Sequence, residues 1–125
     1  MRVYNKQLTT NQVLNVNSTS PASALKSIFM YAMAANFTGS ATGSIKLQAS
    51  NDPETNDTPP SGIPFPAPTH WADIANSTFA IVPGMTEVLW NVRDVAYNYV
   101  RVVYTDGSGG TSTATMNIVI NGKGQ

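Results

Sequence analysis

Two strand-forming segments near the carboxyl end constrain the fold of this chain most. Residues 97–104 are β-branched and aromatic, and a glycine-rich stretch at 107–110 follows them. Such a run bounded by turn residues predicts a β-strand, and its apolar side chains on both faces indicate a central position in a sheet. Residues 111–120 then alternate polar and apolar side chains. We therefore expect these two strands to pair as a hairpin, with residues 107–110 as its turn.

The alternation also predicts which side chains of these strands point into the core. Successive residues of a strand point to opposite faces, so every second residue shares a face. In the first strand Val100, Val102 and Tyr104 share one face, and the other face carries Tyr97, Tyr99, Arg101 and Val103, so both faces hold apolar side chains. In the second strand the residues expected to point inward are Ala114, Met116, Ile118 and Ile120.

A second hairpin is expected within residues 26–50. Its turn is the glycine-bounded stretch 38–43, and residues 44–50 alternate as a half-buried strand does. The preceding run, residues 24–35, is rich in helix formers, so propensity alone favours a helix. We nevertheless expect a strand, because its apolar residues alternate across both faces and its partner follows the turn.

Shorter strands are expected at residues 13–16, 79–82 and 87–92, the last two separated by a turn at Pro83-Gly84. At 125 residues the chain has the size of a single domain. The sequence therefore predicts one all-β domain with seven or eight antiparallel strands.

Residues 51–69 hold six of the eight prolines. Proline removes the backbone donors that helices and central strands need, so this segment is expected to be a long loop. Loops of this length inside compact domains are usually functional or form interfaces. We therefore expect a contact surface here.

Composition excludes several classes of function. Seven basic and seven acidic residues cancel, so no net charge attracts the chain to nucleic acid or to an anionic membrane. The absence of cysteine excludes disulfides, thiolate catalysis and thiolate metal sites. The first residues run into polar positions, which predicts neither a secretory signal nor a membrane segment and favours synthesis in a cytoplasm.

Few residues offer chemistry. The single histidine, His70, stands beside Trp71 with Asp73 close in sequence. Without a serine elbow or a second histidine, we interpret it as a loop residue packed beside an aromatic ring and expect no enzymatic activity.

An acidic cluster lies in the proline-rich loop. Asp52, Glu54 and Asp57, together with Asn51 and Asn56, could offer oxygen ligands to calcium. The spacing lacks the glycine and the terminal bidentate glutamate of an EF-hand, so a solvated loop is the favoured interpretation, and we expect no metal and no cofactor.

Aromatic residues allow two interpretations, a carbohydrate-stacking platform or core packing. Trp90 lies inside an expected strand and is predicted to be a buried anchor, whereas Trp71 follows the loop and is the better candidate for ligand contact. Arg101 interrupts an apolar strand face and needs a partner. We expect a structural ion pair with Asp94, the pair Asn51-Asp52 being the alternative.

Four segments carry a resemblance to a known group of proteins. Taken in order, residues 44–52, 71–74, 97–104 and 121–124 resemble small virion proteins of tailed phages across about residues 26–124. The shared order is a strand ending in Ala-Ser-Asn-Asp, a proline-bearing loop, a tryptophan, a Tyr-Val-Arg strand and a short Lys-Gly tail. The same order is similar to discoidin-like and other jelly-roll sandwiches.

The resemblance implies a β-sandwich of jelly-roll type that is made in the host cytoplasm and incorporated into a virion. The implied role is a non-enzymatic structural protein that decorates or cements a capsid or joins a tail. Its partners would be copies of itself, in a homo-oligomer, and a major capsid or tail protein. The alternative is a carbohydrate- or receptor-binding module that uses Trp71, with a glycan as ligand.

The resemblance does not extend to residues 1–22. We expect these to form an amino-terminal arm with a first short strand, which could reach a neighbouring subunit, and residues 23–125 to form the sandwich.

Overall fold

The computed structural model describes residues 3–56, 63–64 and 66–124, and these residues form β-strands without a helix. The strands are β1 (Val3–Val13), β2 (Ser18–Thr19), β3 (Ser23–Ala24), β4 (Met30–Thr38), β5 (Gly43–Ser50), β6 (Thr55–Asn56), β7 (Ile63–Pro64), β8 (Ala72–Asp73), β9 (Phe79–Ile81), β10 (Glu87–Val92), β11 (Tyr99–Asp106) and β12 (Thr115–Lys123). In the part of the chain described, no helix is long and apolar enough to cross a membrane.

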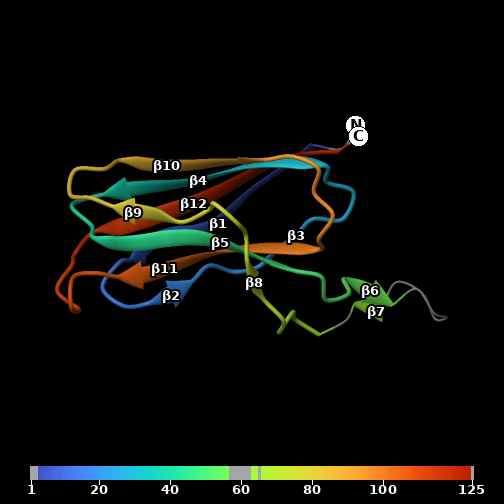
Figure 1. Ribbon diagram of the computed structural model, residues 1–125, viewed down its shortest axis with the longest axis horizontal. Coiled ribbons are helices and arrows are strands. Elements are labelled where there is room, and N and C mark those ends of the chain that lie inside the picture. Colours follow the sequence, from blue (N-terminus) through green and yellow to red (C-terminus); the bar gives the residue numbers. More distant parts are fainter. Residues whose placement is uncertain (1–2, 57–62, 65, 125) are drawn as a thin grey trace.

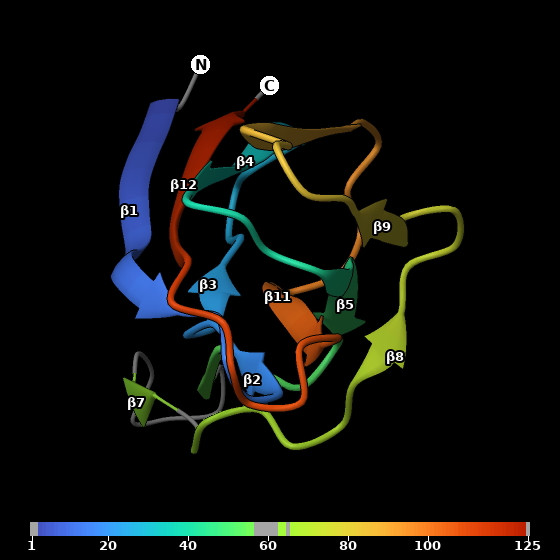
Figure 2. The same ribbon diagram turned by 90° about the vertical axis from the view of Figure 1, so that its left-hand side faces the viewer.

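Ten of these strands form two antiparallel sheets that face each other (Figures 1 and 2). The four-stranded sheet has the order β1-β12-β4-β10. The six-stranded sheet is built on the pair β11-β5, with β2 and β3 beside β11 and β8 and β9 beside β5. The molecule is therefore a β-sandwich, and the expectation of an all-β fold is confirmed.

Side chains that point inward from both sheets form the core. The residues expected to point inward from the last strand, Ala114, Met116, Ile118 and Ile120, are all buried, and so is the face of β11 that carries Val100, Val102 and Tyr104. On β4 the buried face consists of Tyr31, Met33, Ala35 and Phe37. This strand lies between β12 and β10, which confirms that residues from 30 onward form a central strand and not a helix.

Both expected hairpins are wrong. β4 pairs with β12 and β10, whereas β5 pairs with β11, so the turn at residues 38–43 carries the chain from one sheet to the other. The connection from β11 to β12 makes a second crossing of this kind. Glycines correctly indicated where the chain turns. A turn alone does not determine whether the next strand pairs with the preceding one or joins the opposite sheet.

The two crossings meet at Gly43 and Gly107. A β-carbon on Gly43 would lie 2.0 Å from the carbonyl oxygen of Thr105, and one on Gly107 would lie 2.7 Å from the nitrogen of Gly43. Gly43 also has a φ of +118°, which side chains rarely adopt. Two glycines therefore let the backbones touch where the chain changes sheets.

The hydroxyl of Tyr104 contacts two connections and the end of its own strand at this end of the sandwich. It lies 3.1 Å from the carbonyl oxygen of Leu14, 2.8 Å from that of Thr42 and 3.2 Å from Oδ1 of Asp106. Its single proton serves one acceptor at a time. Burial, followed by the nearby Asp106 carboxylate, raises the pKa of Tyr104 to about 12.

The amino-terminal segment is part of the sandwich, which corrects the expected boundary between residues 22 and 23. β1 pairs with β12 from Val3 opposite Lys123 to Val13 opposite Thr115. The strand expected at residues 13–16 is absent, since β1 ends at Val13. Two irregularities in the register interrupt the alternation of β1, so its sequence lacks a regular strand pattern.

The short strands near the proline-rich loop follow the sequence more closely. β10 covers the expected residues 87–92, and β9 ends one residue earlier than expected. Between them Met85 N–H donates to the Val82 carbonyl at 3.1 Å, and Gly84 has a φ of +88°. Within the loop β6 and β7 pair as a small hairpin that lies beyond the end of both sheets (Figure 1).

Candidate binding site at the base of the proline-rich loop

The carboxylate of Asp52 closes the proline-rich loop at its base. It accepts hydrogen bonds from the backbone N–H of Thr69 at 2.7 Å and of His70 at 3.1 Å. Nδ1 of His70 lies 3.0 Å from Asp52 Oδ1. These bonds, that of Thr69 first, lower the pKa of Asp52 below its ordinary value. One ionised side chain therefore joins the entrance and the exit of the loop.

The segment before β11 holds the same base from the other side. Asn98 N–H donates to the Ser50 carbonyl at 3.0 Å, and its side-chain amide donates to the Asp52 carbonyl at 3.1 Å. Glu54 Oε1 accepts from Leu25 N–H at 3.2 Å. The start of the loop is thus hydrogen-bonded to the segment at Leu25 and to the segment at Asn98.

A depression of about 680 Å³ lies between these segments. It is lined by residues from 25–29, from 51–54 and from 95–98. Its walls mix amides and charged groups such as Asn51, Glu54 and Lys26 with apolar groups. This combination suits a polar ligand or a peptide segment better than a purely apolar molecule.

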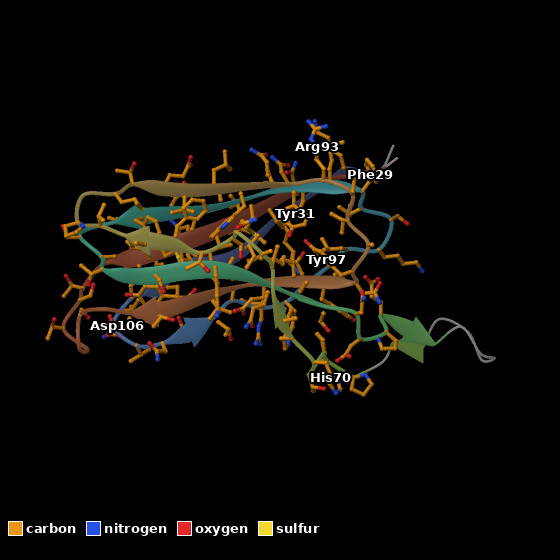
Figure 3. All side chains as sticks on the ribbon, viewed as in Figure 1. Phe29, Tyr31, His70, Arg93, Tyr97 and Asp106 are labelled. Carbon is orange, nitrogen blue, oxygen red and sulfur yellow. The ribbon has the colours of Figure 1, made fainter. Side chains whose placement is uncertain are left out.

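Tyr97, which lines this depression, pairs with a tyrosine of the four-stranded sheet. The hydroxyls of Tyr31 on β4 and Tyr97 lie 2.7 Å apart, and Figure 3 shows both residues between the layers. Burial raises the pKa of both phenols, and the contact with Tyr97 raises that of Tyr31 further. The Tyr97 hydroxyl beside the depression is therefore neutral and already hydrogen-bonded.

A second depression, of about 590 Å³, shares Asn51 and Tyr97 with the first. Its lining includes the rings of His70, Trp71 and Tyr97. The His70 side chain is 86% exposed, and it projects at the lower margin of the molecule (Figure 3). Rings and small polar groups thus line a surface hollow directly beside the loop.

Trp71 is held in place by Arg101. The guanidinium carbon of Arg101 lies 4.1 Å from the centre of the Trp71 ring, which is the geometry of a cation–π contact. Trp71 Nε1 donates to the carbonyl of Pro68 at 3.3 Å. The indole is fixed on the outer face of the six-stranded sheet, and one of its faces is already covered.

Arg101 does not form the expected ion pair. Its Nε and Nη2 donate to Oε1 of Gln48 at 2.9 and 2.7 Å, and no ion pair joins it to Asp94 or Asp52 within the residues described. Gln48 is its direct cross-strand neighbour, whereas Asp94 occupies a turn with a φ of 56°. Burial lowers the pKa of Arg101. The sequence could not show which residue the register would place opposite.

The hydrogen bonds continue across the sheet. Gln48 Nε2 donates to Asp73 Oδ1 at 2.8 Å, and Lys46 Nζ lies 2.9 Å from Asp73 Oδ2. These two contacts, that of Gln48 first, lower the pKa of Asp73. Arg101, Gln48, Asp73 and Lys46 therefore form one polar network that supports Trp71.

The structure brings together Asp52, His70 and Trp71 from the expected site residues, with Glu54 beside the neighbouring depression. Asp57 lies outside the described residues. Among those described, no three acidic or histidine side chains converge as metal ligands do. Sequence reasoning missed Asn98, whose role depends on its position immediately before β11 and on no motif.

The aromatic residues fall into two groups, those packed in the core and those that line the surface hollow. Trp90 is buried and its Nε1 donates to the Ser77 carbonyl at 2.7 Å, which confirms the expected anchor. Tyr104 is buried as well. Trp71 and Tyr97 remain at the surface hollow.

The fold is an antiparallel β-sandwich that carries a projecting loop, with two surface depressions at the base of that loop. No protein-family model matches the chain, and no curated protein matches it. Among solved structures it is similar to the SPBc2 prophage-derived protein YomS, with a TM-score of 0.56 and 9% sequence identity. The match covers 98% of this chain and 94% of that chain. At this identity the likeness shows a shared fold.

Proposed function

We propose that this chain is a non-enzymatic structural protein of a phage particle that decorates or cements a capsid. The observation that carries the proposal is the correspondence, over nearly the full length of both chains, with a prophage-derived protein. The resemblance of four sequence segments to small virion proteins supports the same class. The proposal places the chain in the virion after synthesis in the host cytoplasm.

The site supports contact with another protein more than it supports catalysis. Catalytic groups work in desolvated positions that shift their pKa toward their task. Here the His70 side chain is 86% exposed and Asp52 is engaged in closing the loop. A fixed base with a projecting hairpin suits docking onto a major capsid or tail protein.

The test is sedimentation of particles from the phage or lysogen that encodes the chain. We expect the chain to move with intact particles through a density gradient. A variant in which residues 55–64 are replaced by a Gly-Ser linker should fold with the same far-ultraviolet spectrum and remain at the top. Val82→Ala, an exposed change elsewhere, serves as control. A wild-type chain that stays apart from particles contradicts the proposal.

Carbohydrate or receptor binding is the second candidate. The hollow lined by His70, Trp71 and Tyr97 beside Thr69 and Asn51 favours it, because sugars stack on rings and bond to small polar groups. A glycan array tests it. Binding that Trp71→Ala abolishes and Val82→Ala preserves would support this role, whereas an array without signal would remove it.

A further inference from the structure

The strand β10 is an open edge of the four-stranded sheet. Of the described strands, only β4 pairs with it. Phe37 N–H donates to the carbonyl of Thr86, its opposite residue. Because hydrogen-bonded and non-bonded pairs alternate in antiparallel sheets, the N–H and C=O groups of Glu87, Leu89 and Asn91 point away from β4. Figure 1 shows β10 along the upper margin of the molecule.

The opposite edge of this sheet, β1, carries features that prevent strand pairing. Its register with β12 is interrupted twice, and Asn11 has a φ of 51°. Lys6 stands opposite the buried Ile120, so its charge lies on the core-facing side of an exposed edge. Irregular backbone and inward charges are the usual protection of a free edge.

The β10 edge has none of this protection within its described residues. Its core-facing side chains are the apolar Val88, Trp90 and Val92, and none of its residues has a positive φ or is a proline. On its outer face Leu89 is 50% exposed. One sheet therefore has one protected edge and one edge open to pairing.

We infer that β10 pairs with β10 of a second copy of this chain, antiparallel and about a two-fold axis. The charges on the strand are self-complementary in this arrangement. Glu87 at its start and Arg93 just beyond its end are both exposed, and Figure 3 shows Arg93 pointing outward from the upper margin. With Trp90 on the axis, Glu87 of each copy lies opposite Arg93 of the other.

The same register satisfies the backbone. Glu87 opposite Arg93 and Leu89 opposite Asn91 are pairs whose free N–H and C=O groups face each other, so the strands can exchange hydrogen bonds. Two four-stranded sheets then become one continuous sheet with an isologous interface. A strand pair of this length buries a small area, so the dimer is weak in isolation and gains strength in an array.

This inference adds an interface to the proposed particle subunit, and its test uses the purified chain alone. Sedimentation equilibrium over a concentration series should show a reversible monomer–dimer equilibrium. Leu89→Pro removes an N–H that faces the open edge and none that bonds to β4, so it should give a monomer with an unchanged far-ultraviolet spectrum.

Charge exchange provides the second variant set. Glu87→Arg or Arg93→Glu alone places like charges opposite each other twice and should weaken the dimer roughly tenfold. The double variant restores opposite charges and should recover the affinity. Lys6→Glu on the β1 edge is the matched control and should leave the affinity unchanged.

Two results would overturn the inference. One is a monomer throughout a concentration series that reaches the millimolar range. The other is a dimer that neither Leu89→Pro nor the single charge changes weaken. Either result leaves the particle association open, because the gradient experiment measures that independently.

Discussion

His70 and Asp52 stand 18 positions apart in the sequence, and their side chains meet at 3.0 Å across the two ends of the proline-rich loop. The same carboxylate accepts two backbone N–H groups from the exit of the loop. Hydrogen bonds to an ionised acceptor are the stronger kind. The position of the projecting hairpin therefore depends on the charge of Asp52.

Acid should weaken this closure. The folded-state pKa of Asp52 is lowered, so its contribution to stability is full above the unfolded-state pKa and is lost as the pH falls through the folded value. Asp73 and Asp106 act in the same direction. We expect urea unfolding midpoints to fall progressively below about pH 4.

Asp52→Asn should reduce this acid dependence and lower stability at neutral pH. Asp94→Asn is the matched control, since the Asp94 carboxylate has no hydrogen bond within the described residues and an asparagine tolerates its positive φ. An Asp52→Asn protein with the wild-type slope below about pH 4 would show that the closure contributes nothing to folding.

Trp71 and Arg101 should be energetically coupled. Trp71→Ala removes the ring from the guanidinium, and Arg101→Lys removes the two hydrogen bonds to Gln48 along with the planar stacking group. We expect each change to lower the free energy of unfolding by about 1 kcal/mol. A double-mutant cycle in urea measures the coupling, and additive effects would contradict it.

Tyr104→Phe should destabilise the chain without changing its fold. The variant keeps the ring in the core but leaves the buried carbonyl of Leu14 without this donor, whereas the part-buried carbonyl of Thr42 keeps its bond from Gly107 N–H. We expect a loss of about 1–2 kcal/mol by thermal or urea unfolding. Tyr31→Phe, which removes a hydroxyl at the other end of the sandwich, is a useful comparison.

Alkaline titration of the wild type and of Tyr104→Phe should isolate the contribution of the Tyr104 phenol. Burial raises its pKa to about 12, so the neutral phenol stabilises the fold up to the unfolded-state pKa, and this contribution is lost as the pH rises toward 12. In the wild type, absorbance should show one phenolate, that of Tyr104, which forms only as the pH approaches about 12. In Tyr104→Phe this late rise in absorbance should be missing. Identical titration curves would exclude the buried hydroxyl as its source.

Gly43→Ala should prevent folding or destabilise the chain by roughly 3 kcal/mol or more. The new methyl group would collide with the carbonyl of Thr105, which is backbone and cannot move aside alone. Gly84→Ala is the control, because Gly84 also has a positive φ but nothing lies within 4 Å of the place a β-carbon would take there. Circular dichroism and urea unfolding compare the two variants, and equal effects would mean that φ alone matters.

Individual strands were predicted well because the alternation of polar and apolar residues follows directly from the burial of one face of a strand. The central position of β11 and the inward face of β12 followed from the side chains of Val100 and Ile118 and their neighbours. β4 was identified against its helical propensity for the same reason. β1 was missed because its irregularities and its edge position remove the periodic signal.

Pairing and partners were not predictable in this way. The turn residues Gly39 and Gly43 indicate a reversal in either a hairpin or a crossing, and only the second sheet decides between them. Likewise, Arg101 needed a partner, but Gln48 became that partner through the register of β5 against β11. The proline-rich loop was recognised from composition, whereas its closure by Asp52 required the fold.

The crossings at Gly43 and Gly107 place strands that follow each other in the sequence in different sheets. Within the two sheets no strand pairs with the next one along the chain, so long segments must close before any ladder gains hydrogen bonds, and such topologies fold slowly. The base of the proline-rich loop joins the ends of β5, β8 and β11. Under the proposed function, a nascent or damaged chain would lack the base of this loop until its sheets are complete, so only correctly folded copies would join a particle.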